Sequence, residues 1–244
     1  MEDWNLPTFH PSDLPTFQPM TRIVIFANGN LTEPDKLRRR LRHNDRIFCA
    51  DGGTVNALSL GLTPEVIIGD FDSLPPNLIA EMKAAGVSFQ RHPARKDQTD
   101  LELAFQTAVA EGVDEILLVT ALGGRLDQML ANIFLLVRPE YASVRLTLAD
   151  GPQSATVLRS HQTLTLAGQP GDTLSLVPLT PTVRQVNLSG VEWPLVEATL
   201  TFGSTWSISN ALTTPQATVQ IGEGIVLVVH IERSVHEPGA HHRS

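Results

Sequence analysis

The stretch EILLVT at residues 115–120, followed by GGRLD at residues 123–127, decides the fold. Its first part is a short aliphatic run without alternation, which is typical of a strand buried on both faces. Two glycines end the run, and apolar residues then recur at a three-and-four spacing, which predicts a helix over residues 127–137. A buried strand followed by a helix is the repeating unit of a parallel α/β sheet. The apolar stripe of this helix consists of Leu126, Met129, Leu130, Ile133, Phe134 and Val137.

The same alternation extends outward over residues 21–150, which we expect to form one α/β domain. It predicts a doubly wound, mostly parallel sheet with helices on both faces. Buried strands are predicted at residues 22–27, 46–50, 65–68, 88–92, 115–120 and 143–149. Helices are predicted at residues 34–43, 54–60, 76–85, 99–111 and 127–137.

After Gly151 and Pro152 the pattern changes, and residues 151–233 are predicted to form a second domain. Short segments rich in Thr, Val and Leu are separated by Gly, Pro, Asn or Ser, and several alternate, which predicts an antiparallel sandwich or barrel. Its strands are expected at residues 156–159, 163–167, 173–178, 183–188, 197–202, 217–221 and 225–231.

The two ends of the chain have no such pattern. Residues 1–20 carry the repeat LPTFHP and LPTFQP, whose prolines predict an extended arm, either a floppy leader or an arm that docks Phe9 and Phe17 on a neighbouring subunit. Residues 234–244 are predicted to be a disordered tail.

Composition excludes several classes of protein. The net charge of −8 and the pI near 5.4 argue against a nucleic-acid partner. No apolar run reaches the roughly 18 residues of a membrane span, and no signal peptide is evident. The single cysteine, Cys49, rules out an internal disulfide framework and suits packing inside a buried strand. We therefore expect a cytoplasmic protein.

Four acidic motifs stand where predicted strands give way to helices: DGG at residues 51–53, GDFDS at 69–73, KDQTD at 96–100 and GGRLD at 123–127. In an open parallel sheet these junctions share one edge, so their carboxylates converge. Each pair of like charges about 4 Å apart costs roughly 4 kcal/mol at an effective dielectric near 20, unless a cation joins them. The sequence thus predicts a divalent metal, with magnesium favoured by oxygen ligands, that faces a phosphate substrate.

Individual residues suit these roles. If the chain stays extended, Asp70 and Asp72 point to one side and can share a cation, although an Asp-x-Asp pair can also decorate a turn or cap a helix. Thr99 and Glu102 form a capping-box pattern that places Asp100 in the first helical turn. Lys96 suits a phosphate oxygen as a point charge.

Two glycine pairs, Gly52–Gly53 and Gly123–Gly124, offer backbone amides to phosphate. Arg125 could clamp phosphate, and Asp127 could accept from Arg125, a ribose or a base. The sequence has neither the G-x-G-x-x-G fingerprint nor the G-x-x-x-x-G-K-[ST] loop, which disfavours ordinary Rossmann dehydrogenases and P-loop kinases.

In this order, the acidic motifs resemble those of the thiamine pyrophosphokinase family. The resemblance covers roughly residues 22–232, because GDTLSL at 171–176, GVEWPL at 190–195 and SISN at 207–210 resemble the family's second domain. It implies an α/β catalytic domain followed by a β-sandwich, in a homodimer whose active site lies at the subunit interface. It also implies magnesium-dependent transfer of diphosphate from ATP to the hydroxyethyl group of thiamine, with release of AMP.

The resemblance also implies roles for single residues. Metal and phosphate positions match Asp51, Asp70, Asp72 and Asp100, of which Asp70, Asp72 and Asp100 are the expected catalytic carboxylates. Positions around the nucleotide match Asp51, Gly52, Lys96, Asp97, Thr99, Arg125 and Asp127. The thiamine pocket matches Ser209 and Asn210.

The chain departs from the family pattern at two places. Gln128 stands where histidine is usual, and glutamine cannot titrate. Ala211, Leu212 and Thr213 follow Ser-Asn where some relatives have an aromatic residue, so Trp193 and Trp206 are the candidates to stack on thiamine. Two alternatives stay open: a diphosphokinase for another alcohol, such as a hydroxymethyl pterin, and a non-catalytic nucleotide-binding module.

Overall fold

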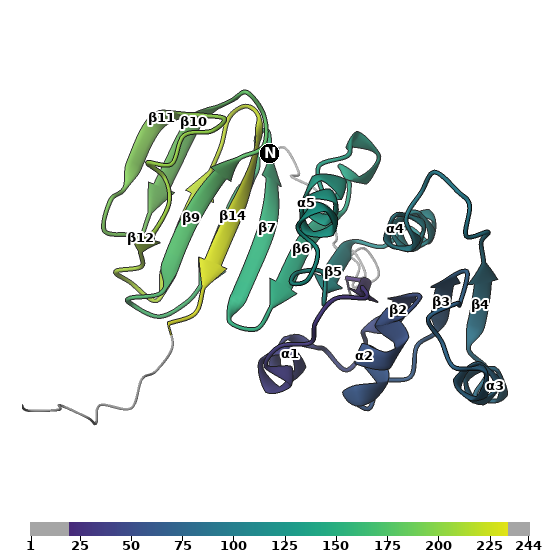
Figure 1. The fold of residues 1–244 in the computed structure, drawn as a ribbon. Coiled ribbons are helices and arrows are strands. Elements are labelled where there is room, and N and C mark those ends of the chain that lie inside the picture. The colour runs from purple at the N-terminus through teal and green to yellow at the C-terminus, as the bar shows by residue number, and fades with distance from the viewer. Residues whose placement is uncertain (1–19, 234–244) are drawn as a thin grey trace, which may run out of the picture.

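The computed structural model of this chain describes residues 20–233. The arm and tail predicted from the sequence lie outside that range, apart from Met20. Figure 1 shows a helix-covered sheet on one side of the molecule and stacked antiparallel strands on the other. No helix of the described part is long and apolar enough to cross a bilayer.

Six strands form the predicted parallel sheet, in the order β6-β5-β1-β2-β3-β4. The order reverses at β1 and β5, which pair in parallel although three strands and their helices separate them in sequence. This is the topological switch point of a doubly wound sheet. The strands are β1 (Arg22–Phe26), β2 (Arg46–Ala50), β3 (Val66–Gly69), β4 (Ser88–Arg91), β5 (Glu115–Val119) and β6 (Arg145–Asp150).

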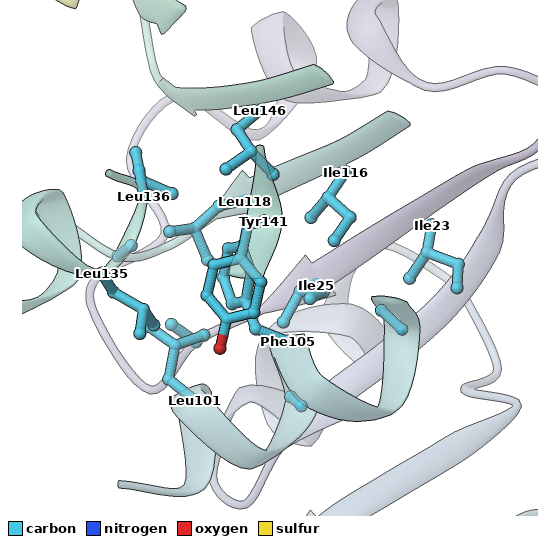
Figure 2. Packing of buried hydrophobic residues seen from close by; sticks show 14 of the residues in the cluster. Ile23, Ile25, Leu101, Phe105, Ile116, Leu118, Leu135, Leu136, Tyr141 and Leu146 are labelled. Atoms are coloured by element: carbon cyan, nitrogen blue, oxygen red, sulfur yellow. The ribbon is translucent and has the colours of Figure 1, made fainter. Parts of the chain in front are cut away.

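Helices cover both faces of these strands (Figure 1). Ile23 and Ile25 of β1 pack in the cluster that contains Phe105, which Figure 2 shows. Val24 and Phe26, the alternate residues of β1, pack in the cluster on the opposite face. Alternate strand residues are thus buried on both faces, which explains the lack of alternation in the sequence. The helices are α1 (Pro34–Arg40), α2 (Gly53–Ser59), α3 (Pro76–Ala84), α4 (Asp100–Ala110), α5 (Leu126–Leu135) and the short 3₁₀ helix η2 (Pro139–Tyr141).

The second half of the chain is an antiparallel β-sandwich. One layer has the order β12-β9-β14-β7, and the other is a separate four-stranded sheet, β11-β10-β13-β8. Their inner faces share one apolar cluster, to which Leu176 and Val228 contribute from the first layer and Val186 and Val219 from the second. The strands are β7 (Gln153–Arg159), β8 (Thr163–Ala167), β9 (Thr173–Pro178), β10 (Thr182–Ser189), β11 (Leu195–Thr201), β12 (Asn210–Ala211), β13 (Gln216–Gln220) and β14 (Ile225–Ile231).

The two halves share one sheet, which the sequence did not predict. β6 and β7 form an antiparallel hairpin, with Asp150 opposite Gln153, and join all parallel strands to one sandwich layer. The result is a ten-stranded sheet. Ala155 and Val157 of β7 also belong to the core beneath α4 and α5. The chain changes its strand direction at residue 150, where the sequence predicts a domain boundary, but the sheet and its core continue across that point.

Arg159 of β7 ties the sandwich to the end of α5. Its guanidinium donates to the carbonyl oxygens of Leu136, Val137 and Arg138 at 3.0, 3.4 and 3.2 Å. These carbonyls follow the last turn of the helix and have no partner within it. The helix ends at Leu135, two residues before the end that the sequence predicts.

Arg159→Ala is expected to lower the free energy of unfolding by about 1–3 kcal/mol, because it removes the described donors of the Leu136 and Val137 carbonyls. Urea denaturation measures this value. Arg184→Ala is the matched control, because the Arg184 side chain makes a long, exposed ion pair with Glu223 at 3.7 Å. Its expected effect is within about 0.5 kcal/mol. Equal losses for the two variants would contradict a special role for Arg159.

Candidate active site

Three aspartates from separate segments lie together at the carboxyl edge of the parallel sheet. Asp51 follows β2, Asp70 follows β3, and Asp100 begins α4. One oxygen from each carboxylate lies within 4.8 Å of the other two. The strand ends thus bring these three side chains together as the sequence predicts, and Asp72 is not a member of the group.

Local backbone structure explains these positions. The amide of Asp51 donates to Ile68 at 2.9 Å and continues the β2–β3 pairing, while its φ of +42° turns the chain sharply into α2. Thr99 caps α4 as predicted, since its hydroxyl accepts from the amide of Glu102 at 3.1 Å. The second half of the capping box does not form, because the Glu102 carboxylate instead pairs with Arg138.

Asp51 is the buried member of the group, and its Oδ1 atom has no hydrogen-bond partner among residues 20–233. Burial raises the pKa of Asp51, and the charges of Asp100 and Asp70 add to the increase, against an opposing hydrogen bond from Ser73. An unsatisfied buried acceptor costs about 1–3 kcal/mol. A hard divalent cation among the three carboxylates would satisfy that oxygen, so the residues present fit such an ion.

Gly69 leaves the space between these carboxylates open. A Cβ at this position would lie 3.0 Å from the Cβ of Asp51 and 3.2 Å from the carboxylate carbon of Asp100. Any side chain here would crowd the two acids, so the cluster depends on a glycine.

Lys96 is the nearest cation. Its Nζ lies 2.5 Å from a carboxylate oxygen of Asp100, and its side chain is mostly buried. One ammonium faces three carboxylates, so the ionised site keeps an excess of negative charge that a further cation would neutralise.

Asp72 lies apart because the chain does not stay extended after β3. Phe71 has a φ of +69° and is buried, with its ring edge-on to Phe89 at 5.2 Å. The expectation that Asp70 and Asp72 point to one side from an extended segment is therefore wrong. The amide of Asp72 instead donates to the Asp70 carboxylate at 3.1 Å. The Asp72 side chain borders an adjoining hollow, together with Asp70, Arg91 and His92.

A cavity of about 600 Å³ opens beside the aspartates and reaches the switch point between β1 and β5. Ligands of doubly wound folds bind at this position. Its volume suits a nucleotide-sized ligand. Predicted residues that line it are Asp51, Asp70, Lys96, Thr99, Asp100, Gly123, Gly124 and Arg125.

Sequence reasoning missed several polar residues of this cavity. Asn28 and Asn30 follow β1, and Gln98 and Asn132 also line the wall. Gln128, which stands where the family pattern usually has histidine, lines it too. The two asparagines stand at a strand end like the aspartates do, so the same rule would have found them. Asn132 reaches the cavity from α5, and its amide donates to the carbonyl of Ala121 at 2.8 Å.

Three other predicted residues do not line the cavity: Gly52, Asp97 and Asp127. Asp127 pairs with Arg125 at 2.5 Å on the surface, and this contact holds the pKa of Asp127 below its usual value. Gly52 precedes α2, and a Cβ there would clash with the side chain of Asn28, 2.4 Å from its oxygen. Asp97 is exposed on the loop before α4.

Ser209 and Asn210 lie at the other end of the ten-stranded sheet, in β12 and the residue before it. Seven inter-strand steps separate β12 from β2, which is about 34 Å along the sheet at the usual spacing. Figure 1 shows β12 and β2 on opposite sides of the molecule. Within one chain, the two predicted parts of the site are therefore far apart.

Helix α5 exposes part of its apolar stripe. Leu126, Leu130 and Phe134 are 68, 45 and 50% exposed. They are spaced four residues apart and so lie along one face of the helix. Gln128 and Asn132, on the same helix, line the cavity. An apolar face that is exposed among residues 20–233 thus borders the acidic cavity.

A doubly wound sheet whose switch-point edge carries an acidic cluster suited to a cation is typical of enzymes that act on phosphate groups. Residues 37–148 match the family model of the thiamin pyrophosphokinase catalytic domain, and residues 161–226 match that of the thiamin pyrophosphokinase vitamin B1 binding domain. The chain belongs to the thiamine pyrophosphokinase family.

Individual proteins of this family are similar to the chain in both sequence and structure. A thiamine pyrophosphokinase of Bacillus subtilis is 30% identical over 179 residues, which cover 73% of this chain and 84% of the relative. The crystal structure of the Bacillus subtilis protein superposes with a TM-score of 0.78 at 28% identity, over 88% of this chain and all of that one. The Geobacillus thermodenitrificans structure gives a TM-score of 0.75 at 30% identity, over 88 and 99% of the two chains.

Proposed function

We propose that this chain transfers the terminal diphosphate of ATP to the hydroxyethyl oxygen of thiamine, forming thiamine diphosphate and AMP. The observation that carries the proposal is the group of Asp51, Asp70 and Asp100, with its unpartnered buried oxygen, in a chain that also matches the vitamin B1 binding domain. That second match favours thiamine over a pterin alcohol. The intact acidic group argues against a non-catalytic module.

The three clustered aspartates would hold a divalent metal, which we propose to be Mg²⁺ because all donors are carboxylate oxygens. When bound, the ion supplies charge neutralisation for the transferred phosphates. Lys96 adds a point charge, and Arg125 adds a guanidinium at the far wall of the cavity. The amides of Gly123 and Gly124, whose φ values are +82° and +77°, border the same wall.

We assign the remaining nucleotide contacts from the family pattern: Gly52, Asp97, Thr99 and Asp127. In the reaction, the thiamine hydroxyl oxygen bonds to the β-phosphorus, the bond from that phosphorus to the oxygen that bridges it to the α-phosphate breaks, and AMP departs with that oxygen. The hydroxyl proton passes to a carboxylate, for which Asp72 and Asp100 are the two candidates. Asp72 is the exposed one and has no lysine partner among the described ion pairs.

We propose that the working form is a homodimer with each active site at the subunit interface. Ser209 and Asn210 are too far from the aspartates of their own chain to contact the same thiamine. A second copy that covers the exposed stripe of α5 would bring its own sandwich to the cavity that α5 borders. Thiamine, a cation, would then bind between an acidic wall and an exposed indole, either Trp193 or Trp206.

A product assay tests this proposal. The protein with ATP, Mg²⁺ and thiamine is expected to form AMP and thiamine diphosphate in equal amounts, measured by chromatography. Hydroxymethyl pterin in place of thiamine is the matched control and should give no AMP. Turnover of the pterin without thiamine turnover, or ATP binding without AMP formation, would contradict the proposal. Because a single cysteine cannot form an internal disulfide, we propose the cytoplasm as the compartment.

A further inference from the structure

The side chain of Asn210 forms a closed ring of hydrogen bonds with the main chain of Trp193. The Trp193 amide donates to Oδ1 of Asn210 at 3.1 Å, and Nδ2 of Asn210 donates to the Trp193 carbonyl at 2.8 Å. Asn210 is buried, at 8% exposure, whereas Trp193 is 59% exposed. The carboxamide thus pairs with Trp193 as a neighbouring strand would.

These contacts leave Asn210 little capacity to bind anything else. Its Oδ1 also accepts from the amide of Ala211 at 2.9 Å, so both lone pairs of that oxygen are used. A single N–H of the carboxamide remains. A buried side chain with one remaining donor is poorly suited to be a main substrate contact, although the family pattern places it beside thiamine.

The surrounding main chain supports the same arrangement. The backbone amide of Glu192 donates to the carbonyl of Ala211 at 2.9 Å, and the backbone amide of Thr213 donates to the carbonyl of Gly190 at 3.0 Å. Hydrogen bonds at Gly190, Glu192 and Trp193 therefore join the loop at residues 190–195 to the segment at residues 210–213. Asn210 provides the side-chain contact at the point where the exposed indole projects.

We infer that Asn210 is a positioning residue, which holds the main chain of Trp193 so that its exposed indole is fixed before thiamine arrives. The inference rests on the proposed function, and it identifies Trp193, rather than Trp206, as the aromatic residue that meets the substrate. Fixing a ring in advance reduces the entropy lost on binding. Loss of the clamp should therefore weaken thiamine binding and leave ATP binding intact.

The test compares Asn210→Asp and Asn210→Ala with the parent enzyme. Asp keeps an acceptor for the Trp193 amide but places an oxygen against the Trp193 carbonyl. In both variants the KM for thiamine is expected to rise about tenfold, with the KM for ATP and kcat within about threefold. Gln220→Glu, the same amide-to-acid change on an exposed strand residue, should alter none of these.

A second measurement separates positioning from direct contact. In a background that carries Trp4→Phe and Trp206→Phe, Trp193 is the only tryptophan, and its fluorescence anisotropy without ligands reports its mobility. The Asn210 variants are expected to lower this anisotropy. A raised KM with unchanged anisotropy would show that Asn210 contacts thiamine directly, and an unchanged KM would show that Trp193 needs no positioning; either overturns the inference. If the parent forms no thiamine diphosphate, the proposed function fails, and the anisotropy alone decides whether the clamp exists.

Discussion

Asp51→Asn is expected to reduce kcat/KM by about 10³-fold or more, since it removes a charged ligand from the centre of the cation site. The same change should not unfold the protein. Asn has nearly the shape of Asp. Its side-chain amide can donate toward Asp70 or Asp100, at the position where Oδ1 of Asp51 has no hydrogen-bond partner among the described residues. We therefore expect an inactive variant whose melting temperature without metal equals or exceeds that of the parent.

The raised pKa of Asp51 makes the stability difference between the parent and Asp51→Asn depend on pH. Because its pKa is raised in the folded protein, the folded state binds more protons than the unfolded state just above pH 4, so stability falls as pH rises through that window. The loss is complete once the pH has passed the raised pKa of the folded protein, above which Asp51 is ionised in both states. Calorimetry in the presence of a chelator should show that the stability of Asp51→Asn falls less than that of the parent as the pH rises through this window.

Added Mg²⁺ provides the complementary measurement. It should raise the melting temperature of the parent through binding to the folded state, and it should have little effect on Asp51→Asn. Glu81→Gln, an exposed carboxylate on α3, is the matched control and should behave as the parent in both activity and metal response. Activity of Asp51→Asn within about tenfold of the parent would contradict the metal site.

Leu130→Glu is expected to convert the proposed dimer to a monomer and to reduce thiamine diphosphate formation by about 100-fold or more, because an unpaired charge inside an apolar interface costs several kcal/mol. Leu130 is 45% exposed in the single chain, so the substitution should leave the fold and the melting temperature of the subunit nearly unchanged. Sedimentation at micromolar concentration measures the association.

Val55→Glu is the control for this prediction. Val55 is a similarly exposed apolar residue, 51% exposed, on a different helix, α2. It should leave both the dimer and the activity intact. A monomeric parent with full activity, or a Leu130→Glu variant that stays dimeric and active, would contradict a shared active site.

The regular elements could be predicted because their signals are local. Apolar runs such as residues 115–119 and the three-and-four spacing of α5 fix each element, and the rule that strand ends share an edge brings Asp51, Asp70 and Asp100 together. The position of Asp72 could not be predicted in this way. It depends on the left-handed turn at Phe71, which burial of that ring against Phe89 makes favourable only in the folded protein.

Two larger features also escaped prediction. Gly151 and Pro152 stand at the predicted domain boundary, and two residues between strands are also the signature of a hairpin. The pairing of β6 with β7, which continues the sheet across this point, is not visible in the local sequence. Likewise, the spacing of α5 predicts an apolar face, and the spacing alone does not say what covers it. The clamp between Asn210 and Trp193 joins residues 17 positions apart and has no signal in either local sequence.

The β6–β7 hairpin has a consequence for how the enzyme admits its substrates. Many two-domain kinases close over their ligands by swinging one lobe about a flexible joint. Here the hydrogen-bonded ladder between β6 and β7 continues the sheet from one domain to the other, which opposes a hinge at that point. We therefore expect substrates to enter and products to leave by local loop movement, such as that of residues 91–98, or by movement between the subunits of the proposed dimer. Scattering profiles with and without nucleotide should accordingly be superimposable for each subunit.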